Sequence, residues 1–285
     1  MITVRRVGAL RELVHAARTR GERIALVPTM GALHDGHLAL MRHAREVCEC
    51  VVASLFVNPA QFTESADLDR YPRDEGRDAV LLESAGVQVL FAPPVDEVYP
   101  SGFATTVEVT GLSAPLEGEA RGTQHFRGVA TVVTKLLNMV QPDVAFFGQK
   151  DAQQALIIQR LVRDLDMPVR IEIRPTVRES DGLAMSSRNA LLDPAARRQA
   201  AKLSEALFAV ERAAAGDGTS AAAALRAASS ILTAAGIVPE YLAAVDAATL
   251  LPVTAFTNTT LVAIAARVGG VRLIDNVLIN CGNVP

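Results

Sequence analysis

Hydrophobic positions along residues 7–176 follow two alternating patterns. Segments in which apolar residues recur every three or four positions predict helices at 7–21, 36–48, 77–86, 126–142 and 150–166. Between them, short apolar runs predict strands at 23–29, 50–57, 87–93, 143–148 and 168–176. Strands separated by helices form parallel βαβ units, and unbroken apolar runs are typical of strands covered on both faces. The pattern therefore predicts an α/β fold with a doubly wound, Rossmann-like parallel sheet.

The pattern changes in the last third of the chain. Two alanine-rich helices are predicted at 194–214 and 219–235, and the spacing of Leu203, Leu207 and Val210 indicates that the first of them packs against a core. Strands are predicted to follow at 241–247, 259–268 and 272–279. We therefore expect a smaller α+β domain over residues 186–285, after a Rossmann-like domain that binds nucleotide and substrate over residues 1–185.

Composition narrows the class of partner. The 285 residues are 50% hydrophobic, enough for a large core, and carry a formal net charge of -3. This charge leaves no broad basic field for nucleic acid, so a small-molecule partner is favoured. The longest dense apolar stretch, "CVVASLFV", is far shorter than the ~20 residues of a membrane span, which predicts a cytoplasmic protein without membrane association. Cys48 and Cys50 are interpreted as buried small hydrophobes.

The stretch "PTMGALHDGH" joins the first predicted strand of the sheet to a helix, at the edge where wound sheets bind ligands. Gly31 and Gly36 allow close backbone approach, and His34 and His37 lie at a helix N-terminus whose positive potential suits phosphate. Two other interpretations remain open: capping or surface histidines, and zinc ligands. The spacing differs from that of HExxH zinc sites, and no third ligand is nearby.

Two further clusters carry polar residues at the same predicted edge. In "FFGQKDAQQ", Lys150 is one of only three lysines in the chain, and Gln154 follows it by one helical turn. A compact ammonium can follow a phosphate whose geometry changes, although a solvated helix start would also suit a lysine. "SLFVNPAQF" adds the neutral amides Asn58 and Gln61, which can bind hydroxyls or a carboxylate or simply form an Asn-Pro turn.

A third cluster, "RESDGLAMSSRNALLDP", lies near the predicted domain boundary. Ser186, Ser187 and Arg188 offer hydroxyl donors and a planar cation that could close over a triphosphate. An ordinary interdomain linker is the alternative.

Taken together, "PTMGALHDGH", "FVNPAQF", "YPRD", "HFRGVATVVTKLL", "FFGQKD" and "DGLAMSSRN" resemble the pantothenate synthetase family in order and approximate spacing, over about residues 24–194. "HDGH" is similar to the HIGH signature of a wider nucleotidyltransferase group. The resemblance implies an AMP-forming ligase that condenses (R)-pantoate with β-alanine in pantothenate and coenzyme A biosynthesis. ATP and Mg²⁺ would take part, and pantoyl adenylate would be the intermediate.

The resemblance also implies roles for individual residues. Catalysis would involve His34, His37, Lys150, Ser186, Ser187 and Arg188, with His37 as proton donor. ATP would be bound by Met30, Gly31, Ala32, Leu33, His34, Asp35, Gly36, His37, Gly148, Gln149, Lys150, Asp151, Val177, Met185, Ser186, Ser187 and Arg188. Substrate would be bound by Asn58, Gln61 and Gln154, while the Mg²⁺ ligands are not assigned. A homodimer is expected from the family and from the frequency of symmetric dimers.

The chain departs from the family pattern at two places. Gln149 stands where the family usually has Glu, and "GEARGTQHF" lacks a proline and is one residue longer, which affects Arg121 and His125. Two other functions are considered: a nucleotidyltransferase that stops after transfer to a phosphorylated acceptor, and a non-catalytic nucleotide-binding or tRNA-binding protein. A phosphorylated acceptor would need a second basic cluster, and tRNA would need a basic appendage.

Overall fold

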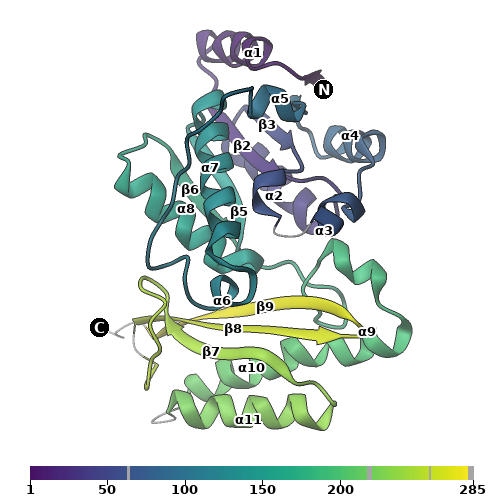
Figure 1. The fold of residues 1–285 in the computed structure, drawn as a ribbon, viewed down its shortest axis with the longest axis vertical. Coiled ribbons are helices and arrows are strands. Elements are labelled where there is room, and N and C mark those ends of the chain that lie inside the picture. Colours follow the sequence, from purple (N-terminus) through teal and green to yellow (C-terminus); the bar gives the residue numbers. More distant parts are fainter. Residues whose placement is uncertain (63–64, 217–219, 257, 282–285) are drawn as a thin grey trace. The chain divides into compact units, whose positions relative to one another are not determined.

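The computed structural model describes residues 1–62, 65–216, 220–256 and 258–281 (Figure 1). The chain folds into two compact units. The N-terminal unit comprises residues 1–148 and 153–175, and the C-terminal unit comprises residues 149–152 and 176–285. The division after Pro175 precedes the predicted boundary between residues 185 and 186. Within the described residues, the helices are too short or too polar to span a membrane.

The N-terminal unit contains a six-stranded sheet in which every recorded strand pair is parallel. Its strand order is β1-β4-β3-β2-β5-β6. The strands are β1 (Ile2–Val4), β2 (Ile24–Thr29), β3 (Cys50–Leu55), β4 (Val89–Phe91), β5 (Val144–Gly148) and β6 (Arg170–Arg174). The predicted Rossmann-like parallel sheet is therefore confirmed.

Alternate residues of the central strands enter two different cores. In β2, Ile24 and Leu26 pack with α1 (Val7–Thr19), α7 (Thr123–Val140) and α8 (Ala152–Asp164). Ala25 and Val27 pack on the other face, with α2 (Asp35–Val47) and α4 (Glu75–Ser84). Because both faces of the strand are covered, its sequence reads as an unbroken apolar run.

The order of the strands reverses at the centre of the sheet. From β2 the chain continues to β3 and β4 on one side, and β5 and β6 lie on the other. Parallel α/β sheets bind ligands beyond the carboxyl ends of the strands at such a switch point. The loop after β2 begins at this edge, and β5, the neighbour of β2, ends there at Gly148.

Several short elements of this unit are not predicted by the sequence pattern. They include β1, α3 (Ser65–Arg70), α5 (Val95–Val98), α6 (Glu117–Arg121) and the 3-10 helix η1 (Pro59–Gln61). β1 contains three residues and pairs only with β4 at the edge of the sheet, where Ile2 is exposed. A strand this short and this exposed leaves no apolar run in the sequence.

The C-terminal unit combines an antiparallel sheet with helices. Its strands β7 (Pro239–Asp246), β8 (Asn258–Val268) and β9 (Val271–Cys281) lie in sequence order, so β9 is an edge strand. Its helices are α9 (Pro194–Ala200), α10 (Lys202–Ala214), α11 (Ala221–Ala234), and the 3-10 helices η2 (Gln149–Asp151) and η3 (Ser187–Leu191). The smaller α+β unit and the burial of Leu203, Leu207 and Val210 are confirmed.

The helix predicted at 194–214 is two helices, so that prediction is wrong in one respect. The break falls at Ala201, whose carbonyl accepts a hydrogen bond from the Ser204 hydroxyl at 2.9 Å. A serine hydroxyl that bonds a carbonyl of the preceding turn competes with the helical ladder. Cys48 and Cys50 are buried, as predicted, and both are free thiols.

Candidate active site

The loop after β2 positions the two histidines at the start of α2. His34 is the N-cap, and its Nδ1 accepts a hydrogen bond from the Gly36 N–H at 3.2 Å. His37 Nδ1 accepts in turn from the His34 N–H at 3.3 Å. The two side chains thus form a reciprocal capping box, with ring centroids 4.0 Å apart.

These hydrogen bonds determine which nitrogen of each ring carries the proton. A ring nitrogen that accepts a hydrogen bond is unprotonated, so each neutral imidazole carries its proton on Nε2. Both Nε2–H groups are donors, and they stand at a helix N-terminus where the backbone already favours negative charge. The capping role and a phosphate-binding role are therefore compatible in His34 and His37, because they use opposite nitrogens.

A buried carboxylate holds the loop that precedes the histidines. Asp78, on α4, is 1% exposed and accepts from the N–H groups of Ala32 at 2.8 Å and Leu33 at 2.9 Å. Gly31 adopts φ 86°, and a Cβ there would lie 2.9 Å from Asp78 Oδ2, which only glycine avoids. Asp78 is a residue of the candidate site that the sequence analysis missed.

The predicted substrate residues Asn58 and Gln61 lie together in the N-terminal unit. Gln61 Oε1 accepts from Asn58 Nδ2 at 3.1 Å, and Gln61 Nε2 lies 2.9 Å from Met30 Sδ. Asn58 is 1% exposed; its Nδ2 also donates to the Gly128 carbonyl at 3.1 Å, and its Oδ1 accepts from the Tyr99 hydroxyl at 2.8 Å. Burial raises the pKa of Tyr99 to about 12.

This environment changes the expectation for Asn58. The sequence predicts direct substrate contact, but the structure places both ends of the amide in hydrogen bonds within the protein. Asn58 thus contacts Gln61 from within the protein, and its role in binding substrate stays a prediction. Gln61 itself is partly exposed, which suits a residue that contacts a ligand.

The segment that departs from the family pattern also contacts Gln61. His125 Nδ1 lies 2.8 Å from the Gln61 carbonyl oxygen, and His125 Nε2 lies 3.3 Å from the Arg121 guanidinium. A carbonyl only accepts, so the ring donates from Nδ1 and accepts at Nε2. Gly122, at φ 81°, separates α6 from α7. In this segment, which departs from the family pattern, Arg121 therefore contacts His125, and His125 contacts the main chain of Gln61.

The two glutamines at the start of α8 have different environments. Gln153 is 5% exposed, and its amide bonds the carbonyls of Leu112 and Pro115 and the N–H of Glu117. Gln154, the predicted substrate residue, is partly exposed. Gln153 therefore orders the preceding loop, whereas Gln154 has surface available for a ligand.

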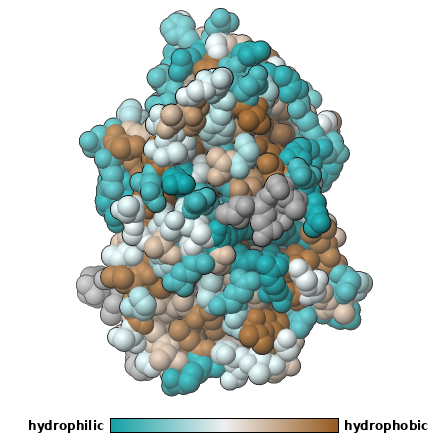
Figure 2. Space-filling view, in the orientation of Figure 1, coloured by the Kyte–Doolittle hydropathy of each residue, from teal (hydrophilic) through white to brown (hydrophobic). Residues whose placement is uncertain are grey.

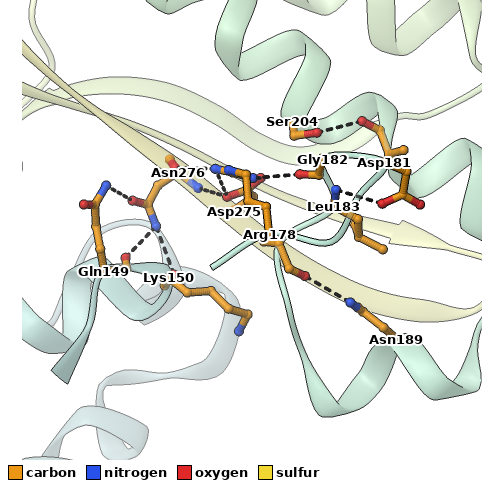
Figure 3. A network of polar contacts seen from close by, with 12 residues as sticks. Gln149, Lys150, Arg178, Asp181, Gly182, Leu183, Asn189, Ser204, Asp275 and Asn276 are labelled. Atoms are coloured by element: carbon orange, nitrogen blue, oxygen red, sulfur yellow. Dashed lines mark hydrogen bonds and ion pairs between the residues drawn. The ribbon is translucent and has the colours of Figure 1, made fainter. Parts of the chain in front are cut away.

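In the C-terminal unit, Lys150 lies in the turn η2, which is held by β9. Asn276 Nδ2 donates to the carbonyls of both Gln149 and Lys150, at 2.9 Å each (Figure 3). Asn276 Oδ1 accepts from Gln149 Nε2 at 3.3 Å. Lys150 Nζ lies 3.7 Å from Asp151 Oδ1, and its side chain extends away from the Asn276 amide (Figure 3).

Residues 177–185 form a hairpin that leads to Ser186, Ser187 and Arg188. Arg178 pairs with Ala184 across this hairpin, and the Met185 N–H donates to the Val177 carbonyl at 2.9 Å. Ser186 then caps η3 by accepting from the Arg188 N–H at 3.2 Å. The predicted residues Val177 and Met185–Arg188 are thus adjacent parts of one folded segment.

A buried ion pair joins this hairpin to β9. Arg178 donates to Asp275 Oδ2 at 2.6 Å and to Asp275 Oδ1 at 3.0 Å (Figure 3). Burial raises the pKa of the Asp275 carboxyl, and the hydrogen bonds from Arg178 oppose that rise. Asp275 and Asn276 were not predicted, since neither lies in a motif or at a strand end.

The structure thus brings the predicted residues together in two groups. In the N-terminal unit, Gln61 contacts Met30 directly after β2, and His34 and His37 contact each other at the start of α2. In the C-terminal unit, Gln149–Asp151 and the hairpin that leads to Ser186–Arg188 both contact β9. On the face of the molecule that Figure 2 shows, hydrophilic and hydrophobic residues are interspersed.

Comparisons with known proteins place these residues in a family context. The family model for pantoate-beta-alanine ligase matches residues 2–278. Pantothenate synthetase from Acidiphilium cryptum is 53% identical over 281 residues, which are 98% of this chain and 100% of that protein. Pantothenate synthetase from Moorella thermoacetica is 51% identical over 277 residues, which are 96% of each protein.

Solved structures give the same result. The crystal structure of pantothenate synthetase from Thermus thermophilus has a TM-score of 0.91 and 49% identity, and covers 97% of this chain and 99% of its own. The pantoate-beta-alanine ligase from Francisella tularensis, complexed with beta-gamma ATP and beta-alanine, has a TM-score of 0.80 and 32% identity. That match covers 98% of this chain and 97% of the Francisella chain.

Proposed function

The chain belongs to the pantoate-beta-alanine ligase family, and from that premise we propose that it activates pantoate with ATP as pantoyl adenylate before β-alanine attacks. The observation that carries this proposal is the capping box of His34 and His37, whose Nε2–H groups are donors at the N-terminus of α2. Such donors suit the charge that develops on phosphate oxygens during adenylation.

The chemistry explains why an adenylate is needed. A carboxylate resists attack by an amine because oxide is a very poor leaving group. Attack of a pantoate carboxylate oxygen on the α-phosphorus forms the P–O bond of the mixed anhydride and releases pyrophosphate. The amine of β-alanine then attacks the acyl carbon, AMP leaves, and the amine loses a proton. Each new bond forms between substrates, so no covalent enzyme intermediate is required.

We assign ATP binding to segments of both units. In the N-terminal unit these are Met30–His37 and Gly148, and in the C-terminal unit Gln149–Asp151, Val177 and Met185–Arg188. Lys150, Ser186, Ser187 and Arg188 would stabilise charge on the phosphates, and His37 would donate a proton. The Francisella relative, complexed with beta-gamma ATP and beta-alanine, supports ATP as the co-substrate.

Pantoate would be held by Gln61 and Gln154. The Gln61 Nε2–H group lies against Met30 Sδ, and a thioether sulfur is a weak acceptor. A pantoate oxygen in place of the sulfur would form a stronger hydrogen bond. Neutral amides suit an acceptor substrate that carries hydroxyls and one carboxylate.

Mg²⁺ would enter with the triphosphate. This ion usually keeps several waters and is bound largely through substrate phosphates. In the described ranges no three His, Cys, Asp or Glu side chains gather into a metal-binding group. Neutralisation of the phosphates is the chemistry that Mg²⁺ would supply.

We also propose that the protein is a cytoplasmic homodimer formed through the N-terminal unit. The family resemblance and the frequency of symmetric dimers support this assembly. Sedimentation at micromolar protein should give twice the mass of one 30.2 kDa chain. A monomer mass would contradict it.

An exchange experiment tests the adenylate. Purified protein is incubated with ATP, Mg²⁺, pantoate and labelled pyrophosphate in the absence of β-alanine. We expect label to enter ATP only when pantoate is present, because adenylation is reversible and needs no amine. Exchange should be lost in Lys150→Ala and weakened in Ser187→Ala and Arg188→Ala, while Gln61→Ala should weaken pantoate binding.

Two results would contradict the adenylate mechanism. One is exchange that begins only after β-alanine is added, and the other is exchange of equal rate without pantoate. AMP formation measured in parallel, with and without β-alanine, shows whether the complete reaction proceeds in the same preparation.

A further inference from the structure

Two neighbouring residues of β9 contact the two segments of the C-terminal unit that we assign to ATP. Asn276 contacts the turn that carries Lys150, and Asp275 contacts the hairpin that leads to Ser186–Arg188 (Figure 3). Both are 3% exposed. Buried polar side chains with this many partners fix the geometry of what they contact.

The amide of Asn276 has only one orientation in this structure. Its Nδ2 donates to two consecutive carbonyls, those of Gln149 and Lys150, and both are acceptors only. Its Oδ1 therefore has to accept, and it does so from Gln149 Nε2. The main chain at Lys150 is thus held from both of its flanking peptide groups.

The ion pair on the neighbouring residue holds the second segment. Arg178 bonds both oxygens of Asp275, and its remaining donors reach the Gly182 carbonyl at 3.1 Å and the Asn276 carbonyl at 3.3 Å. The guanidinium also lies 4.9 Å from the ring centre of Phe208. A planar, bidentate arrangement of this kind fixes direction as well as distance.

Both contacts start from β9, which is paired with β8 along its length. Consecutive residues of a strand point to opposite faces, so the two side chains leave β9 in different directions. Asp275 pairs with Ile264 and Asn276 with Ala263 in the ladder with β8, the central strand of this sheet. The strand therefore sets the separation between the turn and the hairpin.

We propose that Asp275 and Asn276 are positioning residues that set the spacing between Lys150 and Ser186–Arg188. This inference rests on the proposed function, in which both segments bind the phosphates of one ATP. A misplacement of about 1 Å by a residue outside the chemistry can cost about 10²-fold in rate.

The first experiment is a double-mutant cycle with Asn276→Asp and Lys150→Ala. Asn276→Asp keeps the shape but turns an oxygen toward two carbonyls, so kcat/KM for ATP should fall by about 10²-fold. In the Lys150→Ala background, in which adenylation should be lost, the affinity for ATP is measured by calorimetry, and the same change should lower it far less because Asn276 acts through Lys150. Asn280→Asp is the matched control, since Asn280 lies on the same strand and is exposed.

A second cycle keeps the proposal testable if Asn276→Asp does not fold. Arg178→Lys retains the charge but loses the bidentate geometry, so it should lower kcat/KM for ATP. That loss should shrink when it is combined with Arg188→Ala. Circular dichroism and the melting temperature establish which variants are folded, and the KM for β-alanine should stay near its wild-type value in each.

The proposal would be overturned if Asn276→Asp caused the same loss with and without Lys150, or if Arg178→Lys caused the same loss with and without Arg188. Folded Asn276→Asp and Arg178→Lys variants with wild-type kcat/KM for ATP would also overturn it. The wild-type protein separates this failure from that of the proposed function. If it does not make AMP from ATP, pantoate and β-alanine, the proposed function fails. ATP binding measured by calorimetry in the same variants then tests the spacing separately from catalysis. We expect Asn276→Asp to lower the affinity for ATP, and we expect this loss to disappear in the Lys150→Ala background.

Discussion

The loop before α2 and the turn at Lys150 both follow strands of the parallel sheet, but they are held by opposite chemistry. In the loop, backbone N–H groups donate to the carboxylate of Asp78, and two histidines cap each other within four residues. In the turn, backbone carbonyls accept from the amide of Asn276, which lies 126 residues away from Lys150. The histidine cap of the first segment is local in the chain, whereas Asp78 lies 45 residues from Leu33 and Asn276 lies 126 residues from Lys150.

This difference makes the histidines the strongest test of the comparison. We expect His34→Ala and His37→Ala each to lower turnover by roughly 10² to 10³, the typical loss for one preorganised donor to developing charge. The capping loss should lower the free energy of unfolding by only about 1 kcal/mol. Steady-state kinetics and chemical denaturation of each variant measure the two effects. Turnover like that of the wild type in either folded variant would exclude the phosphate role.

Asp78→Asn tests the carboxylate half of the comparison. It replaces an acceptor of two backbone N–H groups, so a buried donor loses its partner and the free energy of unfolding should fall by about 1–3 kcal/mol. Turnover should also fall because the loop before His34 loses its anchor. Urea denaturation and kinetics measure this, with the exposed Asp96→Asn as control. A variant as stable and as active as Asp96→Asn would show that the loop holds itself.

Gln149→Glu tests the turn at Lys150, which is the second segment of the comparison. Asn276 Oδ1 is fixed as an acceptor, so a carboxylate at position 149 loses the hydrogen bond from Gln149 Nε2 and places two oxygens together. We expect a several-fold change, on the order of the roughly 1 kcal/mol of one hydrogen bond, in the ATP or Mg²⁺ dependence. The KM for β-alanine should change little. If titrations with ATP, Mg²⁺ and β-alanine overlay those of the wild type, the difference between Gln149 and the usual Glu has no effect on the dependence on these components.

The smallest expected effect concerns acid stability near the hairpin. Hydrogen bonds from Arg197, and then from Asn189, lower the pKa of Glu179 below its usual 4.5. The contribution to stability is therefore complete above 4.5 and is lost as the pH falls through the lower, folded-state pKa. Glu179→Gln should flatten this acid dependence of the free energy of unfolding. Denaturation curves at several pH values would contradict it if their slopes match those of the wild type.

The same contrast explains what could be read from the sequence. The two layers of helices follow from apolar runs in β2, β3 and β5, and the helical periodicity that begins at Gly36 indicates a helix start near the histidines. Asp78 and Asn276 left no such signal, because their partners are backbone groups far along the chain. Asn58 looked like a ligand residue because of its type, and only burial shows that its amide is used internally. The break at Ala201 coincides with a hydrogen bond from the Ser204 hydroxyl, which no periodicity records.

The hydrogen bonds around Asn58 also have a polarity. Backbone groups at Gly128 and Ala60 fix which end of the Asn58 amide is the donor, and the Tyr99 hydroxyl donates in the same sense. Asn58 Nδ2 in turn donates to Gln61 Oε1, so Gln61 Nε2 is the donor end of the second amide and contacts Met30 Sδ. If Gln61 binds pantoate as proposed, its amide therefore offers a donor, and a ligand group that is also only a donor would be disfavoured there.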